Sequence, residues 1–263
     1  MASEASRAGA GVVDATFREP PSADPAFYVF NTASNWLGGI VPTGPATIAS
    51  AKSWPPITFS AAVTTLEAIN VTGQLPMQVA ARQRVEANKA GLMLTCSDLT
   101  LVGDLNANVV LKHAIFEGRD YAASVSGPGG GPAGTIFGDV ASPNGLVSPG
   151  GNNGGGVGTL NIAGSYVQGH SDPANPIAAM LQIGADGTGV SRLNVTGRAQ
   201  LVDKCALVIQ VNSADVPLGK KITVLSAKAG LNGVFKYVEA FPQEYTATPD
   251  YDDNNAYVTL TRS

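Results

Sequence analysis

Charged side chains are scarce in this sequence, and neither sign is clustered. Lys and Arg number 16 and Asp and Glu 20 among 263 residues, so charged residues make up 14% of the chain, against about 25% in an ordinary soluble domain. Phosphate groups are bound mainly by clustered cations. A net charge of −4 without a Lys/Arg cluster therefore argues against a nucleic-acid partner and against an anionic membrane surface.

Long apolar runs and helical periodicity are lacking as well. The first residues contain acids and no run of about 7 to 15 apolar residues, so they do not form a signal peptide. No stretch reaches the roughly 18 apolar residues of a membrane helix. If the chain is exported, we expect its targeting segment to lie outside this sequence. Only residues 76–90 approach a 3.6-residue period, so we predict little helix.

Cysteine and histidine are too few to suggest a metal or redox site. Cys96 and Cys205 belong to no CxxC motif and have no histidine set nearby, and we expect two buried thiols rather than a disulfide. His113 and His170 lie in no recognisable nucleophile motif, and no GxSxG elbow is present. We interpret His170 as a solvated turn residue.

Glycine and proline are abundant, with 31 and 17 residues, and they separate short extended segments. One pattern recurs, in which two apolar residues alternate with other residues and a glycine follows. Such a unit is typical of a strand with one buried face that ends in a tight turn. Its copies lie at 69–73, 99–103, 160–164 and 193–197, with a degraded copy around Gly138, and the average period is about 31 residues.

A strand unit that repeats at a near-constant interval predicts an all-β solenoid of coils stacked along an axis. A β-sandwich is the alternative, but its strands usually recur every ~8–12 residues. In the solenoid, the aliphatic residues of each copy point inward in stacked rows, and the residue between them points outward. The inward residues are Ile69, Val71, Leu99, Leu101, Leu160, Ile162, Leu193 and Val195, and the outward ones are Asn70, Thr100, Asn161 and Asn194.

Glycine-rich runs at 127–132 and 150–156 are predicted to be loops that divide the chain. We expect residues 1–25 to be a disordered segment or a cap, 26–145 to form N-terminal coils, and 146–263 to form a C-terminal unit. The C-terminal half is predicted to be the more stable one. Its strands are the more aliphatic, and the polar run 82–89 of the other half is not expected to propagate a ladder.

The motifs from residue 145 onward follow a definite order. They are Ser148-Pro149-Gly150, Gly158-Thr159-Leu160, a strand ending in Thr196-Gly197, a strand at 221–227, Gly233-Val234-Phe235 and the sequence YDDNNAYVTL at 251–260. This order resembles the last part of autotransporter passengers of the pertactin-like class, although Ser191-Arg192 replaces the usual Asp-Lys pair. Residues 33–42 are similar to the opening of autotransporter-associated strand repeats, and Trp36 within them also fits a core aromatic that caps the first coil.

The resemblance implies a right-handed single-stranded parallel β-helix that is located at the cell surface or outside the cell. It also implies that the C-terminal half seeds the folding of the rest of the chain. It implies a C-terminal outer-membrane β-barrel translocator as partner, which this sequence does not contain. The implied function is non-enzymatic: a passenger that acts as a stalk and candidate adhesin toward host or neighbouring cells, with no cofactor. A truncated gene product that folds without export is a further reading.

The alternative function is a carbohydrate-active β-helix, either a polysaccharide lyase or a tailspike-like depolymerase. Such enzymes group acids, or acids with Lys or Arg, on one face. The candidate acids Asp172, Asp186, Asp252 and Asp253 lie in turn-like sequence, where Asp favours the backbone conformation in any case. Residues 155–160 are similar to the calcium nonapeptide, but Leu160 occupies the place of its ligand aspartate. We therefore predict no catalytic, cofactor-binding or metal residue.

Overall fold

The computed structural model describes residues 13–18, 21–22, 24–50, 55–73, 76–116, 119–127, 131–151 and 156–263. Within these ranges the chain is all-β, and its helical elements are two short 3-10 turns, η1 (Pro25–Tyr28) and η2 (Ala33–Asn35). Most of the cap or disordered segment expected at 1–25 lies outside the described residues. The prediction of an all-β chain with little helix is confirmed.

A large sheet of 17 described strands is built mainly from parallel pairs. Its antiparallel pairs are β9 with β10, β22 with β26, and β25 with β26. The strands are β1 (Ala15–Thr16), β2 (Pro45–Ser50), β4 (Val63–Gly73), β6 (Arg84–Thr95), β8 (Asp104–Asn106), β9 (Val109–Phe116), β10 (Arg119–Ala122), β12 (Gly131–Ile136), β13 (Val140–Ser142), β15 (Gly158–Ile162), β16 (Tyr166–Gln168), β19 (Arg192–Val195), β20 (Ala199–Leu201), β22 (Lys221–Ala227), β23 (Leu231–Asn232), β25 (Tyr245–Tyr251) and β26 (Asn255–Arg262).

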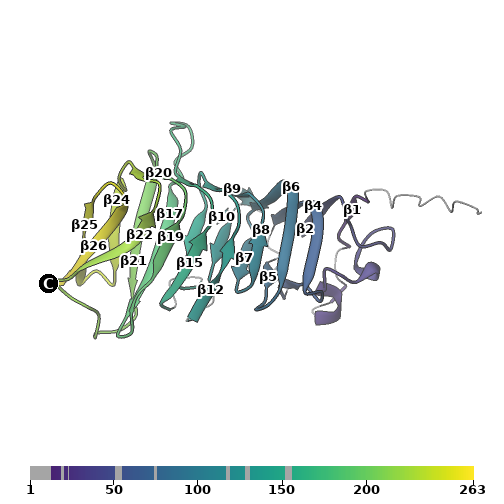
Figure 1. The fold of residues 1–263 in the computed structure, drawn as a ribbon, viewed down its shortest axis with the longest axis horizontal. Coiled ribbons are helices and arrows are strands. Elements are labelled where there is room, and N and C mark those ends of the chain that lie inside the picture. The colour runs from purple at the N-terminus through teal and green to yellow at the C-terminus, as the bar shows by residue number, and fades with distance from the viewer. Residues whose placement is uncertain are drawn as a thin grey trace, which may run out of the picture.

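A second sheet of nine described strands has its parallel strands in chain order. They are β3 (Ile57–Thr58), β5 (Met77–Val79), β7 (Asp98–Leu101), β11 (Ser124–Ser126), β14 (Leu146–Ser148), β17 (Ala179–Asp186), β21 (Cys205–Val211) and β24 (Tyr237–Phe241), with β18 (Gly189–Val190) paired antiparallel to β17. Figure 1 shows an elongated molecule in which the strands follow one another along the long axis from purple to yellow. Long parallel sheets exclude the antiparallel sandwich.

The predicted register is confirmed. All eight inward residues of the repeated pattern are at most 1% exposed, whereas Asn70, Thr100, Asn161 and Asn194 are only half-buried. Each aliphatic residue is covered by its register partners in the neighbouring strands, so the core is a set of rows that run across the sheets.

The interpretation of the four copies as one stacked unit is wrong. Ile69 in β4 pairs with Leu92, and Leu99 in β7 pairs with Met77 in the other sheet. The last two copies are in register, with Leu160 opposite Leu193, and the degraded copy is in register with them, with Ile136 opposite Ile162. The offset between neighbouring turns of the chain also varies, since Thr65 bonds to Glu86 over 21 residues and Asn194 bonds to Asn161 over 33. A period-2 pattern fixes which face is buried but does not fix the neighbour.

The glycines that end the pattern allow a close approach between turns of the chain. A Cβ added to Gly164 would lie 2.2 Å from the carbonyl oxygen of Gly138, and one added to Gly197 would lie 2.5 Å from that of Gly164. Gly138, Gly164 and Gly197 thus form a column of close backbone contacts, which we call the glycine column. Only a residue without a side chain fits there.

Two expectations about irregular segments were wrong. The polar run 82–89 does propagate a ladder, because β6 begins at Arg84 and pairs with β4, β8 and β9. Val85 and Ala87 are buried there, and the charged residue between them, Glu86, is only half-buried, so alternation outweighs polarity. The first glycine-rich run is also not all loop, since Gly131 and Pro132 begin β12. Residues 128–130 and 152–155 of the two runs lie outside the described residues.

Both sheets cross the boundary expected at 145/146. β11 pairs with β14 in the smaller sheet, and β13 pairs with β16 in the larger one. At the other end, Trp36 is fully buried and its indole nitrogen donates to the carbonyl of Phe30 at 2.7 Å. The rings of Phe17 and Phe30 meet it edge-on at 5.0 and 4.8 Å between centroids. Trp36 is therefore a core aromatic at the N-terminal end of the sheets.

Candidate functional site

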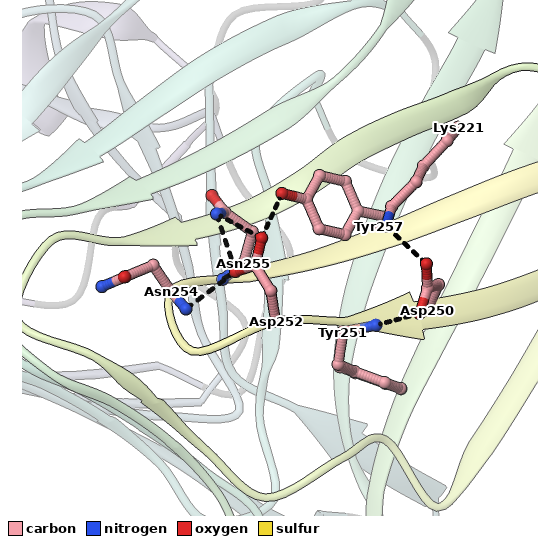
Figure 2. Close-up of polar contacts among 7 residues, drawn as sticks. All are labelled: Lys221, Asp250, Tyr251, Asp252, Asn254, Asn255 and Tyr257. Atoms are coloured by element: carbon pink, nitrogen blue, oxygen red, sulfur yellow. Dashed lines mark hydrogen bonds and ion pairs between the residues drawn. The ribbon is translucent and has the colours of Figure 1, made fainter.

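The densest exposed polar network lies on the hairpin of β25 and β26, where the YDDNNAYVTL sequence is found (Figure 2). Asp252 forms the turn, and its Oδ1 accepts the backbone N–H groups of Asn254 and Asn255 at 2.8 Å each. Asp is suited to this place because its short carboxylate bonds to its own backbone two residues on. The turn brings Asp250 directly opposite Tyr257 in the antiparallel register.

The second oxygen of the Asp252 carboxylate accepts the phenol of Tyr257 at 2.5 Å. This bond is the largest cause of a lowered Asp252 pKa, which falls to about 2, and the donors from Asn254 and Asn255 lower it further. The same bond raises the pKa of Tyr257. A group whose charged form is bonded by several donors stays ionised, so Asp252 is a poor proton donor at neutral pH.

Lys221 connects this hairpin to β22. Its Nζ lies 2.5 Å from Oδ2 of Asp250 and 4.1 Å from the centre of the Tyr257 ring. The hydrogen bond between the two charged groups raises the pKa of Lys221 and lowers that of Asp250. Because these side chains are exposed, solvent screens the pair. The network therefore joins β22, β25 and β26 at the C-terminal end of the larger sheet.

Asp172 and Asp186 also serve turns, as their sequence context predicted. Asp186 accepts the backbone N–H of Thr188 at 2.7 Å, and this bond and that from the Thr188 hydroxyl lower the pKa of Asp186. Asp172 accepts the N–H of Ala174 at 2.9 Å. The described structure thus places these acids in separate turns and does not bring them together on one face.

His170 is half-buried and holds the loop before β17, whereas the sequence predicted a solvated turn residue. Its Nδ1 accepts the backbone N–H of Asp172 at 3.2 Å, and its Nε2 lies 2.8 Å from the carbonyl of Ile177. A neutral ring that accepts at Nδ1 carries its proton at Nε2 and donates it to that carbonyl. Lys204 supports the same loop by donating to the carbonyl of Asp172 at 2.8 Å.

The remaining candidates are placed as follows. The thiols of Cys96 and Cys205 are buried and are not joined in a disulfide, as expected. His113 lies on β9, where its backbone N–H donates to the side chain of Asn144. In the described ranges, no group of three His, Cys, Asp or Glu side chains is placed to hold a metal ion. No helix of those ranges is long and apolar enough to span a membrane.

Sequence reasoning missed Lys221, Asp250 and Tyr257 as partners. A hairpin loop at 252–255 would have paired Asp250 with Tyr257, because antiparallel strands on either side of a short turn are in fixed register. The approach of Lys221 depends on the long-range pairing of β22 with β26, for which the local sequence carries no signal.

No family model matches this chain, and no curated protein matches it. The resemblance to autotransporter passengers therefore stays a prediction that depends on the order of the motifs alone.

Proposed function

We propose that the chain is a right-handed single-stranded parallel β-helix that serves as the passenger stalk of a bacterial autotransporter. The parallel pairs between strands of successive turns support the β-helix. Connections between parallel strands of one sheet are right-handed in about 98% of proteins, because a right-twisted strand packs back onto its sheet in that sense only. This supports the handedness.

The observation that carries the function is the continuity of the two sheets along the long axis of the molecule (Figure 1). Rows of aliphatic side chains run through the core, and the candidate acids bind to turns instead of converging on a substrate. Stacked units that contact only their neighbours make long, regular surfaces whose loops can vary. A stalk needs such a surface and no reactive centre. The motif order at 145–260 supports the passenger class.

Location is tested on intact cells that produce the native chain from its own locus. External protease should remove the chain from an immunoblot, while a periplasmic marker in the same sample stays whole. A chain that survives until the cells are lysed would contradict the surface location. The sequences on both sides of the gene provide a second test, in which we expect an upstream signal peptide and a downstream translocator barrel.

The carbohydrate-active alternative predicts turnover. Purified chain is incubated with a panel of polysaccharides, and new reducing or unsaturated ends are measured. The stalk predicts no new ends. Cleavage that is abolished by a single Asp→Asn substitution would refute the stalk proposal and support the enzyme.

A further inference from the structure

A hollow lies on the outer face of the larger sheet, away from the C-terminal network. Its volume is about 370 Å3, and it spans β12, β15, β19 and β22. One row across these strands carries hydroxyl and amide side chains in register: Thr135 opposite Asn161, Asn161 opposite Asn194, and Asn194 opposite Ser226. Neighbouring strands are ~4.8 Å apart, so a chain that lies across them meets a polar group at each strand.

The asparagines in this row keep bonding capacity for a ligand. Asn194 Nδ2 donates to Asn161 Oδ1 at 3.1 Å. This uses one donor of one amide and one lone pair of the other, and each amide has two donors and two lone pairs. Both side chains are only half-buried. The row therefore presents donors and acceptors side by side, as a ligand rich in hydroxyl groups requires.

Two cations complete the lining, and no carboxylate is among the described residues that form it. Lys228 is exposed at the end of β22, and Arg192 is half-buried at the start of β19. The Arg192 Nε is buried and has no hydrogen-bond partner among the described residues. In a chain of net charge −4, this pair of cations without acids selects an anion.

The ligand class follows from these groups. The hollow lies on the face of a sheet whose backbone groups are used by neighbouring strands, so a peptide cannot bind there by adding a strand. Arg and Lys bind carboxylates through charge-assisted hydrogen bonds, and the amide and hydroxyl row suits sugar hydroxyls.

We propose that this hollow binds an acidic polysaccharide, with Arg192 and Lys228 holding a uronate carboxylate and the Asn161–Asn194 row bonding to sugar hydroxyls. The inference needs only this face of the sheet and does not depend on where the chain is located. If the purified chain binds the saccharide but the chain is not found at the surface of intact cells, this inference stands and the proposed stalk function is refuted.

The test is calorimetric titration of the purified chain with a galacturonate hexamer at low salt, beside a neutral glucose hexamer and poly-glutamate. We expect binding of the galacturonate only, weakened by added salt. Arg192→Gln should reduce affinity about tenfold and the more exposed Lys228→Gln about threefold, because each removes a charge-assisted bond. Lys220→Gln is the matched control: it removes the same charge just before β22, at the end far from Lys228, and should leave affinity within twofold.

Three results would overturn the proposal. The first is that the galacturonate does not bind, and the second is that poly-glutamate binds equally well, which would indicate a site for acidic peptides. The third is that the Lys220 and Lys228 variants lose the same affinity for galacturonate, which would indicate attraction by net charge only. Arg192 is partly buried, so its variant is first compared with the native chain by thermal melting. If that variant unfolds, Lys228→Gln and Asn194→Ala decide, since both change side chains on the outer face.

Discussion

Gly164 offers the sharpest test of how the turns of this chain are packed. In Gly164→Ala the new Cβ would lie 2.2 Å from the carbonyl oxygen and 2.5 Å from the carbonyl carbon of Gly138. Both atoms belong to the backbone, so no side chain can swing aside. The carbonyl of Gly164 in turn accepts the N–H of Gly197 at 2.8 Å. A shift of Gly164 away from Gly138 therefore disturbs the next contact of the glycine column.

The cost follows from these two effects. Overpacking that displaces backbone costs about 1–3 kcal/mol, and a weakened backbone hydrogen bond adds about 1 kcal/mol. We expect the free energy of unfolding to fall by about 2–4 kcal/mol. At roughly 2–4 °C per kcal/mol for a chain of this size, the melting temperature should fall by about 5–15 °C.

The assay is thermal and urea denaturation followed by circular dichroism, with Gly187→Ala as the matched control. The nearest atom to a Cβ at Gly187 is 3.5 Å away, and its φ is not positive, so alanine fits there. That variant should stay within about 0.5 kcal/mol of the native chain or gain slightly from a less flexible unfolded state. If the melting temperatures of Gly164→Ala and Gly187→Ala differ by less than about 1 °C, the backbone is not packed as tightly at Gly164 as the glycine column requires.

Three further predictions concern the C-terminal network and the core. The Asp252 pKa is lowered to about 2, below ~3.9 in the unfolded chain. Its contribution to stability is thus complete above pH ~4 and is lost as the pH falls toward 2. Tyr257→Phe should make the urea midpoint less dependent on pH over that interval. An unchanged pH dependence would contradict the role of the bond between Tyr257 and Asp252. Val195→Asp should lower the yield of folded chain more than Val71→Asp, although both valines are 1% exposed, if the C-terminal half seeds folding; equal yields would refute the seed. Gln168→Leu should lower the free energy of unfolding, measured in urea, by about 2–4 kcal/mol, because the buried amide donates to two backbone carbonyls that would lose their donor. An unchanged free energy would show that water satisfies these carbonyls instead.

The sequence predicted burial well because alternation is a local property. Leu160 and Ile162 lie two residues apart on a strand and must face the same way, and the glycine after them marks where the strand ends. The same reasoning placed Asp172, Asp186 and Asp252 in turns, since an Asp side chain bonds to backbone only two residues away. Each of these predictions needs no knowledge of what lies in the next turn of the chain.

Pairing between turns could not be predicted in the same way. The pattern at 69–73 and the pattern at 99–103 look alike, yet β4 and β7 belong to different sheets. The buried face of any strand is made of aliphatic residues, so similar patterns arise wherever a strand covers the core. The apparent period of about 31 residues combined positions from two sheets. The prediction that residues 82–89 form no ladder was wrong for a related reason. It rested on the polarity of the run and did not consider that Val85 and Ala87 alternate with polar residues and are buried.

The candidate ligand site shows what this limit means for function. Asn161 and Asn194 were identified from sequence only as outward residues that check the register. Their chemical value comes from Thr135 and Ser226, which extend the polar row on either side, and from two cations on neighbouring strands. These neighbours are set by offsets that vary along the chain, such as the 33 residues between the two asparagines. In a molecule of long parallel sheets, a binding face is therefore a property of the register between neighbouring strands. A change in the length of one loop that shifts this register would remove the site even if every lining residue were kept.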